Sequence, residues 1–294
     1  MTDLSGASIS WRGLTIAGTH ASRHWFSLID GWEGVPDVRR DSDARPGAHG
    51  RFSGPAWSDE RVITVTGGAS IPAERDTLLR EVQAAMVVAG DGGEEDLTIT
   101  LAGRELTVGA TLTRFRPDLS RWSSGRFSWA AEWRCPDPLR YGAYVTAPAS
   151  FPTLVGGLEY DLYTDGAGAD LGYLDYGEAS STGRATLTNE GTAATWPQFE
   201  VAGPIDASGF EIVTVGTGAR LVFEGAVPAG SVLVLDSATG AVLMDGESDR
   251  SDLLTWRDWW SVPAGSSVEF AFIRLGSDVG GTPSVTAALR PAFW

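Results

Sequence analysis

Residues 184–197 read RATLTNEGTAATWP, a short β-branched run that ends at Asn189 and Gly191 and restarts before Pro197. Strand-favouring residues closed by turn-favouring residues predict a β-strand followed by a tight connection. The same pattern repeats to the end of the sequence, with further strands predicted at 210–214, 219–223, 231–235, 267–274 and 284–290. Residues 184–294 are therefore expected to form an all-β domain, and no catalytic motif is visible in them.

Charge is distributed unequally along the sequence. Residues 148–294 carry 6 Arg and 19 Asp and Glu, whereas residues 1–147 carry 16 Arg and 19 Asp and Glu, for a net charge of −16. This acidity argues against a protein that grips DNA or RNA, because phosphate binding needs clustered Arg and Lys. A negatively charged surface could still serve DNA by repelling it, so that DNA slides past without binding. Lys is absent, which together with the abundant Ala and Gly indicates a high-GC coding bias.

Composition places the chain among globular proteins. It is 43% hydrophobic, which is enough to build cores, and it has no apolar run of the length that spans a membrane. Residues 1–6 lack the basic and apolar regions of a secretory signal, and Cys135 is the single cysteine. A protein that is made and folded inside a cell, without disulfides and without a membrane anchor, is expected.

The first half of the sequence predicts strands and one helix. Strands are expected at 9–16, 24–29 and 61–66, a hairpin at 97–101 and 104–108, and a further strand at 125–134. The helix starts at Pro72, ends at Gly90 and places Leu78, Val82 and Met86 on one face. Alternating Phe127, Trp129 and Trp133 suggest a filled core. The prediction is a β-sandwich with one α-helix over 1–138, with 35–58 as a long exposed loop.

Residues 135–142 read CPDPLRYG and interrupt the strand pattern, because two prolines lack the N–H that a central strand needs. The Gly-, Tyr- and Asp-rich residues that follow predict an extended linker over 139–183. The expected organisation is therefore a domain over 1–138, this linker, and the β-sandwich over 184–294. We expect the architectural residues to be Pro136, Pro138, Leu139, Tyr141 and Gly142 at the junction, with Pro263 and Gly265 before a later strand.

This order of elements resembles the distal tail protein (Dit) family of siphophages, as found in phages of high-GC hosts. The family pattern N-x-G-T-A-x-x-x-P is matched at Asn189, Gly191, Thr192, Ala193 and Pro197. Residues 260–265 read WSVPAG and are similar to the family's L-P-P-G segment, with Ala264 in place of its second proline. Residues 137–142 resemble the family's stop between domains. The likeness spans nearly the whole chain, and its motifs are signals of turns and strand starts.

The resemblance implies a fold and a role. It implies a mostly β chain whose first domains form a six-membered ring that continues the tail tube and whose galectin-like second domains point outward. Implied partners are further copies of the chain, the tail tube protein, the tail hub and tape-measure proteins, and receptor-binding proteins. Double-stranded DNA would pass through the ring without specific binding. A ring also needs head-to-tail contacts between different patches, for which residues 35–58 and 139–182 are candidate arms. Asp and Glu are expected to outnumber Arg on the lumen face.

The sequence contains no convincing catalytic, metal-binding or nucleotide-binding motif. His20 and His24 are spaced as metal ligands are on a helix, but the sequence around them is typical of a strand, where such residues lie much farther apart. Residues 245–252 lack the turn glycine and the final glutamate of a calcium-binding loop. Cys135 has no histidine partner in its sequence context, and no phosphate-binding or dinucleotide motif occurs. Neither a metal, nor a cofactor, nor enzymatic activity is expected.

Aromatic residues leave one alternative open. Trp256 and Trp259 lie close to Trp260 and are candidates for stacking on a sugar ring, with Trp260 expected in the core. The resemblance implies a structural virion protein that is assembled in the host cytoplasm and lies at the distal end of a phage tail. The alternative is a carbohydrate-binding adhesin that contacts the host cell envelope. Oligomeric mass and sugar affinity would separate the two.

Overall fold

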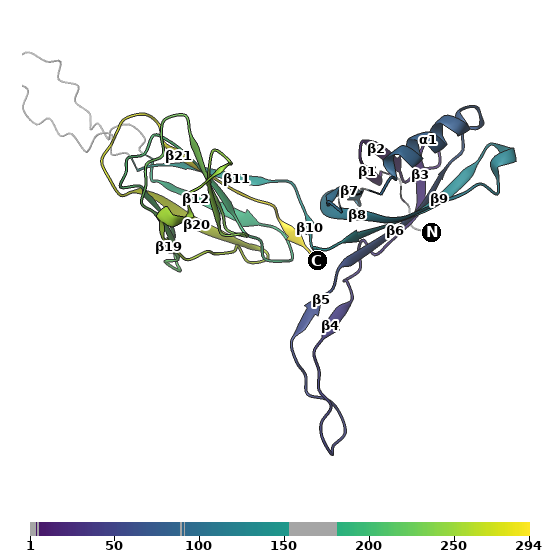
Figure 1. The fold of residues 1–294 in the computed structure, drawn as a ribbon, viewed down its shortest axis with the longest axis horizontal. Coiled ribbons are helices and arrows are strands. Elements are labelled where there is room, and N and C mark those ends of the chain that lie inside the picture. The colour runs from purple at the N-terminus through teal and green to yellow at the C-terminus, as the bar shows by residue number, and fades with distance from the viewer. Residues whose placement is uncertain (1–3, 5, 89, 91, 153–180) are drawn as a thin grey trace, which may run out of the picture. The chain divides into compact units, whose positions relative to one another are not determined.

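The computed structural model describes residues 4, 6–88, 90, 92–152 and 181–294. The chain divides into two compact units (Figure 1). The first unit comprises residues 1–143 and 292–294, and the second comprises residues 144–291. The end of the chain thus returns to the first unit.

Strands dominate the first unit. Its elements are β1 (Ser8–Trp11), β2 (Leu14–Ala17), β3 (Trp25–Asp30), β4 (Val38–Arg40), β5 (Ala56–Ser58), β6 (Arg61–Ala69), the 3-10 turn η1 (Pro72–Glu74), α1 (Arg75–Ala85), β7 (Glu95–Leu101), β8 (Arg104–Asp118), η2 (Trp122–Ser124), β9 (Phe127–Cys135), β10 (Arg140–Tyr141) and β22 (Ala292–Phe293).

In the described residues, seven of these strands close into a barrel in the order β8-β7-β1-β2-β3-β6-β9, because β9 pairs again with β8. β8 pairs with β7 up to Ala110 and with β9 from Thr111 onward, and its register with β9 shifts between Leu112 and Arg114. Such a bulge bends a strand and helps a sheet to curl. The β-sandwich expected for the first domain is therefore corrected to a closed barrel.

The barrel interior is filled by side chains from alternate positions. Phe127, Trp129, Ala131 and Trp133 of β9 are all buried, as the alternation predicted. Trp11 of β1 meets Trp133 edge-on, with ring centroids 5.9 Å apart. Inward alternation looks the same in a sandwich and in a barrel, so the sequence pattern could not distinguish them.

One strand expected near the start of the chain differs in the structure, and the expected helix is present with an earlier end. The strand expected over 9–16 is a hairpin, in which Arg12 and Gly13 turn the chain with φ of 47° and 79°. The predicted helix is present and ends at Ala85, before the expected end at Gly90; η1 begins at Pro72, and α1 buries Leu78, Val82 and Ala85 against the barrel core. Trp11 Nε1 donates a hydrogen bond to the carbonyl of Ala85 at 3.0 Å and ties the helix end to β1.

Residues 35–58, expected as a loop, contain a two-stranded arm. β4 and β5 pair only with each other in the described part of the chain, and Ala44 bridges Arg51 further out. The arm projects away from the barrel (Figure 1). The β8–β9 hairpin also continues past the barrel, through η2.

The second unit contains strands in two sheets. Its elements are β11 (Val145–Ser150), β12 (Arg184–Asn189), β13 (Gln198–Ala202), β14 (Phe210–Thr214), β15 (Arg220–Phe223), β16 (Val232–Asp236), β17 (Ala241–Met244), β18 (Ser248–Asp249), η3 (Ser251–Leu253), β19 (Leu254–Arg257), β20 (Ser266–Arg274) and β21 (Ser284–Leu289).

The two sheets of this unit enclose one core. Their orders in the described residues are β11-β21-β13-β16-β17-β18 and β12-β20-β14-β15-β19. Phe199 of β13 meets Phe270 of β20 edge-on at 5.7 Å, so both sheets contribute to the same cluster. The two-sheet sandwich predicted from the sequence is therefore present.

The linker expected over 139–183 differs from the structure where it is described. Residues 140–141 form β10 in the first unit, and residues 145–150 form β11, which pairs with β21 in the second. Residues 153–180 lie outside the described residues. These two short strands lie among Pro and Gly residues, so the sequence predicted a linker there. Their pairing with strands distant in sequence leaves no local signal. No helix in the described ranges has the length and apolarity needed to cross a membrane.

Candidate assembly interface

Arg61 organises the point where the arm leaves the barrel. It is the first residue of β6 and is 1% exposed. Its Nη1 donates to the carbonyls of Gly31, Trp32 and Gly34 at 2.8–2.9 Å, and its Nε donates to the carbonyl of Pro138 at 2.9 Å. Burial, followed by the neighbouring charge of Arg140, lowers the pKa of Arg61, yet a guanidinium stays charged in proteins. One side chain thus holds the arm root and the junction together.

Arg140 approaches the arm root from the junction side. It is 4% exposed, and its Nη1 lies 3.1 Å from Oε2 of Glu33. Its guanidinium stands 5.3 Å from the ring centroid of Trp32, and its Nη2 donates to the carbonyl of Trp294. We call Arg61 and Arg140, with residues 31–34 and Pro138, the junction node. It joins the arm root, the junction and the end of the chain within the first unit.

The junction residues singled out in the sequence lie at or beside this node. Pro136 is exposed after the end of β9, and the carbonyl of Pro138 is the acceptor for Arg61. Asp137, which the sequence reading passed over, accepts hydrogen bonds from the Leu139 N–H at 3.0 Å and the Tyr141 hydroxyl at 2.6 Å. Gly142 follows β10, and the first unit's main segment ends at the next residue, Ala143.

Sequence reasoning missed both buried arginines. Arginine is seldom fully buried, so its default placement is the surface. One signal was present: Arg61 has the same parity along β6 as Ile63 and Val65, which point into the core. For Arg140, which lies on a two-residue strand, the sequence offers no such signal.

The arm carries an unusual combination of residues. Residues 38–58 contain four arginines and two aspartates in a chain of net charge −16. Val38, Phe52 and Trp57 are 48%, 56% and 50% exposed, and none belongs to the barrel core. An isolated two-stranded hairpin is marginally stable in water, and exposed apolar side chains mark contact surfaces. The arm has the properties of a docking element.

In the second unit, the two sequence motifs meet at one buried amide. Asn189 is 0% exposed, and its Nδ2 donates to the carbonyls of Ala193, Val262 and Pro263 at 2.8, 3.0 and 3.2 Å. Its Oδ1 accepts from the N–H of Gly191 at 2.9 Å. The Gly265 N–H, at a φ of 61°, donates to the Gly191 carbonyl. Pro263 and Gly265 therefore sit in the same hydrogen-bonded turn as the 189–197 motif.

The tryptophans proposed for sugar contact have different environments. Trp256 lies on the edge strand β19 and is 46% exposed, with the guanidinium of Arg220 4.1 Å from its ring centroid. Its Nε1 donates to Asp258. Trp259 packs against the core of the unit, and Trp260 is buried as predicted. Trp256 and Trp259 do not form one exposed aromatic platform.

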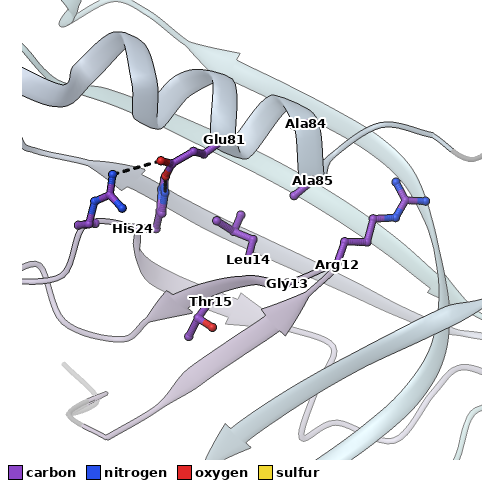
Figure 2. A pocket seen from close by; sticks show the side chains of 9 residues that line it. Arg12, Gly13, Leu14, Thr15, His24, Glu81, Ala84 and Ala85 are labelled. Atoms are coloured by element: carbon purple, nitrogen blue, oxygen red, sulfur yellow. Dashed lines mark hydrogen bonds and ion pairs between the residues drawn. The ribbon is translucent and has the colours of Figure 1, made fainter.

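A pocket of about 540 Å³ lies beside α1 in the first unit (Figure 2). Glu81 points into it and accepts from His24 Nε2 at 2.9 Å and from Arg23 Nη2 at 3.1 Å. The hydrogen bond from His24, with the charge of Arg23, lowers the pKa of Glu81. The acid of this pocket is thus ionised and paired. The arrangement braces α1 against the 23–24 segment.

No other group in the described residues offers a reaction centre. No cluster of three or more His, Cys, Asp or Glu there is placed to hold a metal ion. The rings of His20 and Trp25 lie 4.0 Å apart between centroids in a tilted arrangement. Burial raises the pKa of the Cys135 thiol to about 12, which keeps it protonated and unreactive.

Comparison with known proteins agrees with this architecture. Residues 190–275 match the family model of the siphovirus-type tail component, C-terminal domain. The crystal structure of Dit from phage SPP1, described as a paradigm of the hub adsorption apparatus in phages that infect Gram-positive bacteria, aligns with a TM-score of 0.63 and 14% identity over 98% of this chain and 99% of that chain.

A chain of the phage P2 baseplate, in its activated conformation with calcium, aligns with a TM-score of 0.50 and 10% identity over 97% of each chain. At these identities the two structures establish a shared fold. No curated protein matches the chain. The two comparisons point the same way: residues 190–275 are similar to the siphovirus-type tail component, and the chain over nearly its full length has the fold of SPP1 Dit.

Proposed function

We propose that copies of this chain form a ring at the distal end of the tail, with the barrels side by side around a central hole. The ring continues the tail tube and serves as the hub on which tail hub, tape-measure and receptor-binding proteins assemble. Six copies close the ring, and the second units, as galectin-like sandwiches, face outward. The hub role draws support from the fold shared with SPP1 Dit.

The β4–β5 arm is the structural feature that most supports the proposed ring. It pairs with no other strand of the described chain and presents Val38, Phe52 and Trp57 to solvent. Arginines on the arm oppose the net negative charge of a neighbouring copy. An arm on one subunit and its acceptor on the next make a head-to-tail contact, which generates a ring when the rotation closes. The junction node fixes the direction in which the arm leaves the barrel.

Native mass spectrometry of the purified chain tests the ring. Wild type is expected to show a closed oligomer of six copies, and Phe52→Ala/Trp57→Ala is expected to lower the assembled fraction at least tenfold. Val87→Ala/Val88→Ala is the matched control, since these apolar side chains are similarly exposed outside the arm at 56% and 57%. Equal assembly of both variants would exclude the arm as the contact.

Particle imaging tests the role in the tail independently of assembly in solution. A phage without the gene is expected to produce tails that lack their distal structure, and labelled antibodies against the chain are expected to decorate the tail tip alone. Labelling along the tube or on the head would overturn the assignment.

The lumen of the ring is expected to carry more Asp and Glu than Arg, so that DNA phosphates are repelled and pass without binding. The negative net charge of the chain supports this expectation. A cryo-electron microscopy map of the assembled ring checks it directly. An arginine-lined hole would refute it.

A carbohydrate-binding adhesin is the second candidate, favoured by the half-exposed Trp256 beside Arg220 and Asp258. An aromatic face flanked by polar groups suits a sugar ring. Titration with host envelope oligosaccharides should then quench tryptophan fluorescence in wild type and leave Trp256→Ala unchanged. No response to any glycan would remove this candidate.

A further inference from the structure

The end of the β8–β9 hairpin is the most basic stretch of the first unit. Residues 113–128 contain Arg114, Arg116, Arg121 and Arg126 with Asp118 as the single acid, in a chain of net charge −16. All four arginines are exposed. In the described residues, none of the four lies within ion-pair distance of a carboxylate.

Asp118 offsets only one of the four positive charges, and its carboxylate is held within the turn. Oδ1 accepts from the Ser120 N–H at 2.9 Å, and Oδ2 accepts from the Ser128 hydroxyl at 3.3 Å. The hydrogen bonds from Ser120 are the main cause of its lowered pKa, and the charge of Arg121 adds to them. Four guanidiniums therefore face solvent with a net excess of positive charge.

The hairpin end is held in place by packing inside the first unit. Arg75 Nη1 donates to the carbonyl of Trp122 at 2.9 Å, and its guanidinium lies 3.9 Å from the Trp122 ring centroid. Trp122 in turn contacts Phe127, with ring centroids 6.3 Å apart. A charged surface on a fixed support loses little entropy when it binds. The backbone at the hairpin end is therefore fixed before binding, and the partner has only the arginine side chains to order.

We propose that the hairpin end, residues 113–128, docks on an acidic surface of a second copy of this chain, as a contact separate from the arm. The inference rests on the proposed ring. Copies that each carry a net charge of −16 repel one another. Assembly therefore needs contacts in which opposite charges meet, and this hairpin provides the guanidiniums. Arginine pairs with carboxylates through two parallel hydrogen bonds, which also sets the register of the contact.

The charge of the whole chain favours a protein partner over DNA for this surface. A molecule of this net charge repels a polyanion at long range, and binding to DNA relies on that long-range attraction. A neighbouring copy supplies carboxylates at the high local concentration of an assembly. The second unit contributes most of the excess acid in the sequence.

Sedimentation velocity across a salt series tests the proposal with the full chain. Arg114→Glu/Arg116→Glu is compared with wild type and with Arg80→Glu/Arg250→Glu. The control makes the same change in net charge at exposed arginines outside the hairpin. Circular dichroism confirms that all three proteins are folded. Sodium chloride is raised from about 0.02 M to about 1 M, where the Debye length falls to about 3 Å.

Wild type and the control are expected to self-associate at low salt and to weaken at least tenfold at high salt. The hairpin variant is expected to associate at least tenfold more weakly at low salt and to lose most of the salt dependence. The proposal is overturned if the hairpin variant assembles like the control, or if wild type stays monomeric throughout. Binding of each protein to a DNA duplex is measured alongside. If Arg114→Glu/Arg116→Glu assembles normally but loses binding to the duplex, the arginines contact a polyanion and the proposal is overturned. Because tail-tip labelling is independent of this experiment, the hub role can survive any of these outcomes.

Discussion

At the residue scale, Arg61 shows how one buried charge serves several backbone segments. Its four donated hydrogen bonds join residues 31–34 to Pro138, which are separated by about a hundred positions in sequence. Carbonyls turned inward at an irregular segment need donors, and a planar guanidinium provides several from one side chain.

Replacing Arg61 with Met should therefore leave several buried carbonyls unpartnered. The free energy of unfolding of the first unit is expected to fall by about 2–5 kcal/mol, and Arg61→Lys should fall between this variant and wild type. Urea denaturation measures the loss, and limited proteolysis should cut earlier near residues 31–37. Arg134→Met is the control, since Arg134 is half exposed in its pair with Glu60 and should cost less than about 1 kcal/mol. An equal loss of unfolding free energy in Arg61→Met and Arg134→Met would show that the hydrogen bonds of Arg61 do not stabilise the first unit.

Asn189 has the corresponding role in the second unit. Asn189→Ala removes one acceptor and two amide protons from a buried turn, and we expect a loss of about 2–4 kcal/mol. Hydrogen exchange followed by mass spectrometry should show faster exchange in β12, β13 and β20, with the first unit unaffected. Thr186→Ala, an exposed change on the same strand, should leave the exchange pattern as in wild type. Protection that survives in Asn189→Ala would contradict the role assigned to this amide.

At the element scale, barrel closure depends on backbones that approach closely. A Cβ on Gly67 of β6 would lie 2.4 Å from the carbonyl oxygen of Trp25 and 2.5 Å from Cζ2 of Trp129. The absence of a side chain at this position lets β3, β6 and β9 surround the Trp129 ring. The sequence pattern could not predict this close approach. A glycine within a strand lowers the strand's expected stability, and its packing role is evident only when its neighbours in space are known.

Gly67→Ala should therefore destabilise the barrel by about 1–3 kcal/mol through overpacking. Thermal denaturation is expected to show a lower midpoint for the first unit. Gly90→Ala is the control, since a Cβ there meets nothing within 4 Å, and its midpoint should match wild type. A wild-type midpoint for Gly67→Ala would mean that the strands have room to separate.

At the scale of the whole molecule, the first unit is completed by the last residues of the chain. β22 pairs with β10, Ala292 is 0% exposed, and Arg104 lies over the ring of Phe293 at 4.3 Å. Residues 292–294, which follow the whole second unit in sequence, therefore belong to the packing of the first unit.

Deleting residues 292–294 should expose the edge of β10 and remove the Trp294 carbonyl from Arg140. Hydrogen exchange is expected to accelerate in residues 104–107 and 140–141 and to stay unchanged in β13 and β16. Phe293→Leu, which keeps an apolar side chain and the whole backbone, should give a smaller effect. If the truncated chain exchanges like wild type, the returning strand contributes nothing to the first unit.

Several features followed from the sequence alone. Alternation and turn residues predicted several strands of each unit, the helix after Pro72 and the buried face of β9, because these depend on local period and on backbone preferences. The 189–197 and 260–265 segments pointed to the family because their turns require particular residues. Charge alone indicated a protein that does not grip nucleic acid.

Only the tertiary structure decided how these parts join. Closure of the barrel, the burial of Arg61 and Arg140, the meeting of two motifs at Asn189 and the return of residues 292–294 to the first unit all depend on partners far away in sequence. The period of a strand says which side chains share a face but not which strand lies beside it. That choice is made by packing over the whole unit, and it left the arm and the β8–β9 hairpin projecting from the barrel.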